Sequence, residues 1–168
     1  MPLIKEGAIV PDSWQTIADD APIPASDQVI ISLTRWQKER ETLIGRNAAL
    51  GVRLTSAQSP ATITEDLHRF QVVALEFPKF QDGRAYSYAR LLRERYGFKG
   101  EIRAVGNVLR DQFLFMQRCG FDTYEVATQK AAESWTDSVQ AISRTYQPAA
   151  DDALGTATRP LRWSHGAR

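Results

Sequence analysis

The sequence has few of the residues from which metal and redox centres are built. Its 168 residues include one cysteine, Cys119, and two histidines, His68 and His165, which stand far apart. An iron–sulfur cluster of the usual kind needs four cysteines, and a zinc site needs closely spaced Cys or His ligands. We therefore expect no metal, no prosthetic group and no internal disulfide bond.

Motifs for nucleotide binding and nucleophilic catalysis are also missing. The chain has no Gly-x-Gly-x-x-Gly run, no Gly-x-x-x-x-Gly-Lys-Ser/Thr loop and no Gly-x-Ser-x-Gly elbow. No apolar run approaches the roughly 20 residues that cross a bilayer, and the first residues lack the apolar segment of a secretory signal. We expect a cytoplasmic protein that does not contact membranes.

The balance of charge argues against nucleic acid as a partner. The chain has 21 Lys and Arg against 20 Asp and Glu, which gives a formal net charge of +1. Such a chain has no overall positive field that would attract phosphate backbones. Its length suits a single domain, which we expect to span residues 1–147.

Apolar strand-like runs alternate with helical patterns along this domain. The expected strands are 29–33, 51–55, 72–77, 101–105 and 123–127, and the expected helices are 34–45, 62–68, 84–96, 109–118 and 129–146. Thr34 is placed to cap the first helix. Five such β/α units predict an α/β fold with a parallel sheet, either an open sheet or a half β/α barrel that dimerisation could complete.

The two ends of the chain have a different character. Residues 1–17 predict a small β-hairpin at an edge of the sheet, and residues 18–27 read as a linker. The tail, residues 148–168, has too few apolar residues to fold alone, so we expect it to be mobile. Trp163 lies in a basic part of this tail, where it is either an anchor for a partner or part of a flexible chain end.

Polar residues follow the expected strands at the edge where parallel strands end. Asp82 and Arg84 follow one strand, and Asn107, Asp111 and Gln112 follow the next. Such segments gather at the carboxyl edge of a parallel sheet, and a guanidinium at a helix start suits an anion. We expect Arg84, Arg103, Asn107 and Gln112 to bind a small anion, with Asp82 and Asp111 as candidates for a general acid or base.

Each of these residues also has a structural interpretation. Asp82 can cap the helix that begins near Arg84. Arg103 can form an internal ion pair with Asp111 or Glu76 instead of binding a ligand. The aromatic residues of this helix, Tyr86 and Tyr88, favour packing against the sheet, and its arginines, Arg90, Arg93 and Arg95, form a charged outer face with Glu94.

One long segment carries a resemblance to a known family. The residues concerned are Phe77-Pro78-x-Phe80-x-Asp82-Gly83-Arg84-x-Tyr86-Ser87-x-Ala89-Arg90-x-Leu92-Arg93, then Gly100-Glu101-x-Arg103-Ala104-x-Gly106, Asp111-Gln112 and Arg118-Cys119-Gly120-Phe121-Asp122. With these motifs the chain resembles a bacterial family of unknown biochemical function. Its members usually lie beside genes for assimilatory sulfite reductase and are often labelled as oxidoreductases of sulfite reduction.

Three functions follow as hypotheses. The resemblance, which covers about residues 25–145, implies an accessory protein of sulfite assimilation that binds the sulfite reductase haemoprotein or a small oxyanion. The polar residues at the carboxyl edge are also compatible with an enzyme acting on a small anionic substrate. A structural interaction module is the third hypothesis, and an exposed apolar patch along the N-terminal hairpin or the final helix would favour it.

Overall fold

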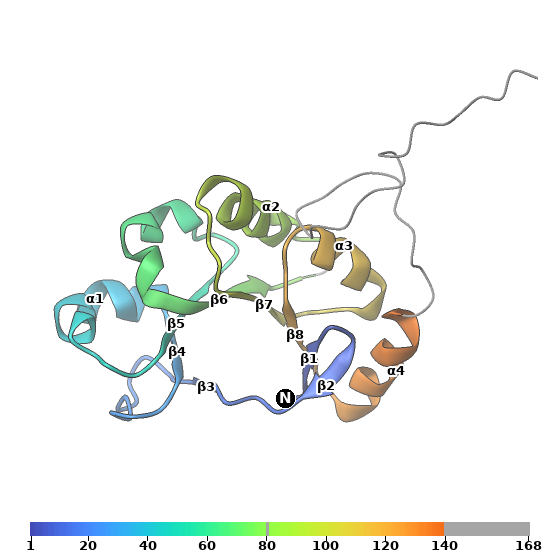
Figure 1. The fold of residues 1–168 in the computed structure, drawn as a ribbon, viewed down its shortest axis with the longest axis horizontal. Coiled ribbons are helices and arrows are strands. Elements are labelled where there is room, and N and C mark those ends of the chain that lie inside the picture. Colours follow the sequence, from blue (N-terminus) through green and yellow to red (C-terminus); the bar gives the residue numbers. More distant parts are fainter. Residues whose placement is uncertain (80, 140–168) are drawn as a thin grey trace, which may run out of the picture.

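The described part of the chain, residues 1–79 and 81–139 of a computed structural model, forms a mixed sheet of eight strands that curls into half a barrel (Figure 1). The strand order is β2-β1-β8-β7-β6-β5-β4-β3. The strands are β1 Leu3–Lys5, β2 Ala8–Val10, β3 Gln15–Thr16, β4 Val29–Ser32, β5 Leu50–Leu54, β6 Phe70–Phe77, β7 Glu101–Gly106 and β8 Thr123–Glu125. Neighbouring strands from β3 to β8 are parallel and follow the order of the sequence.

Helical segments follow each of the longer parallel strands. They are α1 Leu33–Ile44, the 3-10 helix η1 Pro60–Arg69, α2 Arg84–Arg90, the π-helical turn η2 Leu91–Arg95, the 3-10 turn η3 Arg110–Gln112, α3 Phe113–Arg118 and α4 Gln129–Val139. Figure 1 shows that α1, η1, α2 and α3 lie outside the curl, on its convex side. The five expected strand–helix units are thus present in part, because the second contains a 3-10 helix and two others contain irregular turns.

The sheet has a different core on each face because alternate strand residues point to opposite sides. Convex-face residues such as Ile31, Val73 and Ile102 belong to the larger core, together with Trp36 of α1 and Met116 of α3. The concave face carries a smaller cluster, which consists of Ile30, Val72, Ala74 and Val105 with Trp14 packed against it. The central strands are therefore covered on both faces, as their nearly continuous apolar sequences indicate.

The residues that cover the concave face come from the N-terminus. We call residues 11–14, between β2 and β3, the N-terminal strap; in Figure 1 the chain here runs across the open side of the curl. Its Asp12 accepts hydrogen bonds from Arg103 of β7 and from the Trp14 amide. The strap thus covers the concave cluster through Trp14 and the concave side chain of Arg103 through Asp12. A homodimer is not needed to cover this face and stays a prediction.

The expected parallel sheet is confirmed in part: the pairs from β3 to β8 are parallel, and the pairs that involve the hairpin are antiparallel. The predicted hairpin is present as β1 and β2, and β1 pairs with β8 in antiparallel register, Ile4 opposite Tyr124. A hairpin at the end of a parallel sheet can pair in either direction because its two strands have opposite directions. Of the two architectures left open by the sequence, the structure has the half barrel.

Local details also differ from the expectations. Ser32, not Thr34, caps α1, since its Oγ accepts a hydrogen bond from the Arg35 amide at 3.0 Å. The short strand β3 lies inside the segment predicted as a hairpin and pairs with β4. The predicted end of the last helix beyond Val139, the tail 148–168 and Trp163 lie outside the described residues. None of the helices in the described ranges is long and apolar enough to cross a membrane.

Candidate functional site

Asp82 and Arg84 are in direct contact at the carboxyl edge, the edge of the sheet where the parallel strands end. Arg84 Nε lies 2.9 Å from Asp82 Oδ1, and its terminal nitrogen lies 2.6 Å from Oδ2. The same guanidinium donates to Ser56 Oγ, at 3.0 Å, just after β5. Hydrogen bonds from Arg84 and then from Ser56 hold the pKa of Asp82 well below its usual range.

This pairing supports the structural interpretation of Asp82. Its Oδ1 also accepts the Arg84 amide at 3.3 Å, at the first residue of α2. The helix is only seven residues long, and its first amide is already bonded. An anion that approached Arg84 would therefore compete with a carboxylate in contact with the same guanidinium.

Arg103 does not join Arg84, and the expected convergence of the two side chains is wrong. Position 103 alternates with Ile102 and Ala104 of the convex core, so its side chain lies on the concave face. It is 2% exposed and pairs with Asp12 at 2.7 Å and Glu101 at 2.9 Å.

The predicted partners of Arg103 were also wrong. Glu76 pairs instead with Arg53 at 3.2 Å, and Asp111 lies beside Arg110 at 3.8 Å. The sequence alone could not identify Asp12 as the partner, because 91 residues separate it from Arg103.

The other candidates lie in the segment after β7. The Asn107 amide donates to the Phe77 carbonyl at 2.7 Å, which fixes the start of this loop beside the end of β6. The Asp111 side chain is 88% exposed. Gln112 has a buried Oε1 that finds no hydrogen-bond partner among the described residues. These residues share the carboxyl edge, but within the described part of the chain no hydrogen bond or ion pair joins Asp111 or Gln112 to Arg84.

A column of aromatic rings leads from the core to the surface near the same edge. Phe77, the last residue of β6, is buried and lies edge-on to Tyr86 with ring centroids 5.0 Å apart. Tyr86 in turn contacts Phe115 of α3 at 4.8 Å, and Phe115 is 58% exposed. We call these three residues the aromatic column. Burial, with a smaller effect from Cys119, raises the pKa of the Tyr86 hydroxyl.

Sequence reasoning expected Tyr86 and Tyr88 to pack but did not single out Phe115. Tyr86 packs in the column, and Tyr88 donates its hydroxyl to the Ser56 carbonyl at 3.2 Å. The signal for Phe115 was present in the spacing of its helix. Phe113 and Met116 point inward three residues apart, so position 115 between them faces outward.

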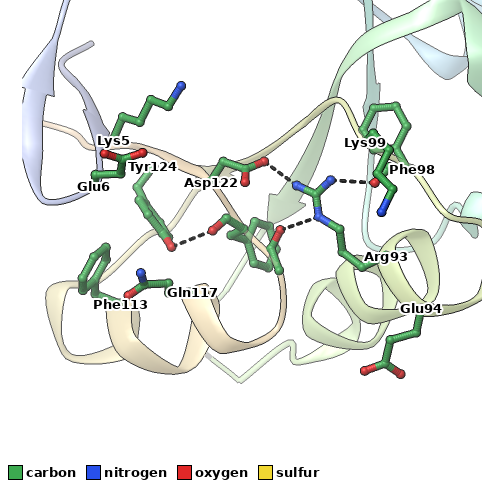
Figure 2. A pocket seen from close by; sticks show the side chains of 12 residues that line it. Lys5, Glu6, Arg93, Glu94, Phe98, Lys99, Phe113, Gln117, Asp122 and Tyr124 are labelled. Carbon is green, nitrogen blue, oxygen red and sulfur yellow. Dashed lines mark hydrogen bonds and ion pairs between the residues drawn. The ribbon is translucent and has the colours of Figure 1, made fainter. Parts of the chain in front are cut away.

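A hollow lies at the opposite edge of the sheet, where the parallel strands begin. We call it the amino-edge hollow; it has a volume of about 520 Å³ and is drawn in Figure 2. Its walls come from β1, the hairpin turn, η2, α3 and the segments before β7 and β8. The lining residues are Lys5, Glu6, Arg93, Glu94, Phe98, Lys99, Phe113, Gln117, Gly120, Phe121, Asp122 and Tyr124.

Arg93 joins three segments around this hollow. The sequence suggested that it lies on a charged outer face, and this expectation is wrong. Its guanidinium donates to the carbonyls of Phe98, Gly100 and Gly120 and pairs with Asp122, so Figure 2 shows it directed into the wall. Arg90 does form the expected surface pair, with Glu94, at 3.0 Å.

Two further findings concern metal binding and similarity to known proteins. Within residues 1–79 and 81–139, no group of three or more His, Cys, Asp or Glu side chains is arranged to hold a metal ion. A family model described as "Bacterial protein of unknown function (DUF934)" matches residues 51–156, more than half of the chain. Neither the curated proteins nor the solved structures contain a significant match.

Proposed function

The chain belongs to the bacterial DUF934 family of unknown function, and we propose that it is an accessory protein of assimilatory sulfite reduction that docks on the sulfite reductase haemoprotein. The choice of pathway rests on the resemblance to a known family that the segment from Phe77 to Phe121 carries. The docking mode rests on the geometry of the same segment, which contains the aromatic column.

The exposed ring of Phe115 is the observation that carries the proposal. A phenylalanine that is 58% exposed leaves a large apolar area in water, although single exposed apolar residues are common on surfaces. The Phe115 ring differs from such single residues because it packs on Tyr86, which in turn packs on the buried Phe77. A rigid aromatic side chain loses little conformational freedom on binding, which is the property of residues that dominate interfaces.

The segment that precedes α3 and the first residue of α2 also suit a protein partner. Leu109, which precedes η3, is 39% exposed, and the side chains of Arg84 and Arg110 are about half exposed. Arg84 and Arg110 each have a carboxylate neighbour, Asp82 or Asp111, so these charges are balanced in pairs. Exposed apolar groups among polar and charged groups are typical of a protein interface.

An enzyme at the carboxyl edge has less support. A general acid or base works best with a pKa near the working pH, whereas Arg84 holds the pKa of Asp82 well below its usual range. Arg103, the proposed second anion-binding residue, is on the concave face and paired. The third hypothesis, a structural interaction module, expects its apolar patch along the N-terminal hairpin or the final helix, and so uses a different surface from the one proposed here.

Binding to purified sulfite reductase haemoprotein tests the proposal. We expect the full-length chain to bind it, and Phe115→Ser to raise Kd about thirtyfold, the loss typical of an interface hot spot. Ile9→Ser is the matched control, since Ile9 is 38% exposed but lies on a different element, the edge strand β2 of the hairpin. It should bind like the wild type.

Two results would contradict the proposal. The first is the absence of a complex, with unchanged turnover of the reductase when the chain is added. The second is a complex that Phe115→Ser and Ile9→Ser weaken equally.

A further inference from the structure

We infer that Tyr86 determines the specificity of the docking surface, because its hydroxyl donates a hydrogen bond to an acceptor on the partner while the Phe115 ring enters an apolar pocket there. The inference rests on the proposed function, since it describes how the aromatic column meets the reductase. It adds the chemistry of the surface that the column recognises, an apolar pocket with a hydrogen-bond acceptor beside it.

The hydroxyl of Tyr86 forms no hydrogen bond within the described part of the chain. The polar and aromatic contacts of this side chain are those of its ring, with Phe77 and Phe115. A buried or half-buried tyrosine usually has a partner for its hydroxyl. Tyr88, two residues further along α2, follows this rule, because its hydroxyl donates to the Ser56 carbonyl at 3.2 Å. The donor of Tyr86 is therefore free to bond to another molecule.

Water reaches this hydroxyl in the free chain. Tyr86 is half-buried, and its oxygen is not one of the fully buried polar atoms that lack a partner. Burial raises the pKa of the hydroxyl, so the group stays protonated and remains a donor at neutral pH. A partner that covers the column displaces the water. The hydroxyl then requires an acceptor on the partner, because a polar group left unpaired in an interface weakens binding.

Packing holds the hydroxyl in a fixed place beside the Phe115 ring. The Tyr86 ring contacts the buried Phe77 at 5.0 Å between centroids and contacts Phe115 at 4.8 Å. A tyrosine held by its neighbours loses little conformational freedom on binding. An apolar ring can enter many apolar pockets, whereas a hydrogen bond forms only where the partner has an acceptor in the right place. The hydroxyl therefore discriminates against pockets that are apolar throughout.

Tyr86→Phe tests the inference, because it removes the hydroxyl and keeps the ring. In calorimetric titration of the full-length chain with purified sulfite reductase haemoprotein, this variant should raise Kd about tenfold, since it leaves the partner's acceptor unpaired. Its melting temperature should equal that of the wild type, because the hydroxyl forms no hydrogen bond with the described residues. Loss of affinity without loss of stability is the result that a merely structural role would not give.

Two other tyrosines provide matched controls. Tyr88→Phe removes a hydroxyl that bonds to the Ser56 carbonyl, so it should lower the melting temperature by about 2–4 °C and leave Kd unchanged. Tyr96 resembles Tyr86, since it is half-buried and its hydroxyl forms no hydrogen bond to a described residue. It lies between η2 and β7, at the amino edge of the sheet. Tyr96→Phe should therefore change neither the melting temperature nor Kd.

The outcomes separate this inference from the proposed function. If Phe115→Ser weakens the complex but Tyr86→Phe binds like the wild type or like Tyr96→Phe, the inference is wrong and the docking surface stands. If Tyr86→Phe lowers the melting temperature as much as Tyr88→Phe, the hydroxyl has a partner inside the chain, and the inference is wrong whatever the affinity. If the wild type forms no complex, the proposed function fails and the inference fails with it.

Discussion

Removal of the Asp12 carboxylate should destabilise the protein by about 3 kcal/mol. Asp12 accepts two hydrogen bonds from Arg103, at 2.7 and 3.1 Å, and Arg103 is 2% exposed. Breaking a buried ion pair by removing one partner costs about 3–5 kcal/mol. We expect the lower end of this range because the variant keeps the ion pair between Arg103 and Glu101, and because the Asp12 side chain is 24% exposed.

Equilibrium unfolding in urea, followed by tryptophan fluorescence, measures this loss in Asp12→Ala. In a chain of this size 1 kcal/mol shifts the melting temperature by about 2–4 °C, so we expect a fall of about 6–12 °C. Asp111→Ala is the matched control. Its side chain is 88% exposed, with Arg110 at 3.8 Å, and its loss should stay below about 0.5 kcal/mol.

A double-mutant cycle separates the ion pair from other effects. Arg103→Met removes the charge that Asp12 neutralises, so the combined variant should lose less than the sum of the two single variants. A loss below about 1 kcal/mol in Asp12→Ala, or strict additivity with Arg103→Met, would refute the view that this pair holds the N-terminal strap on the concave face.

Two further predictions concern the scaffold. Gly106 has φ +91°, and a Cβ there would lie 2.6 Å from the Phe77 carbonyl oxygen, so Gly106→Ala should lower the free energy of unfolding by more than about 1 kcal/mol. Gly45→Ala is the control and should not destabilise the protein, because Gly45 has φ −79°. Equal melting temperatures of the two variants would contradict this prediction. Asp66 accepts two hydrogen bonds from Arg40, which lower its pKa. Its folded pKa lies below its unfolded value of about 3.9, so its contribution is complete above that pH and lost as pH falls through the folded pKa. The stability difference between the wild type and Asp66→Asn should therefore shrink below about pH 4, and a difference that stayed constant would contradict the assignment.

The order of strands and helices could be predicted because local patterns determine it. The run Val72 to Phe77, apolar except for Glu76, has the character of a strand covered on both faces, and it is part of β6. The half barrel was one of two predicted alternatives, since five short units can curl or stay open. The antiparallel pairing of β1 with β8 could not be predicted, because it joins segments about 120 residues apart for which the sequence gives no local signal.

The candidate site was harder to predict for the same reason. Asp82 and Arg84 are close in sequence, and their contact follows from the turn that contains them. The position of Arg103 depends on which face of β7 it occupies, and its partner comes from the distant N-terminal strap. The amino-edge hollow likewise combines the hairpin turn with segments before β7 and β8. Such sites depend on tertiary contacts that no single stretch of sequence encodes.

Hydrogen–deuterium exchange of the chain, alone and with sulfite reductase haemoprotein, tests the docking surface most directly. Residues 84–90 of α2 and 113–118 of α3 carry the aromatic column. We predict that their amides exchange more slowly when the reductase is present, while those of the edge strand β2 keep their rates. Unchanged exchange in both helices at saturating reductase, or protection confined to the hairpin, would contradict the account.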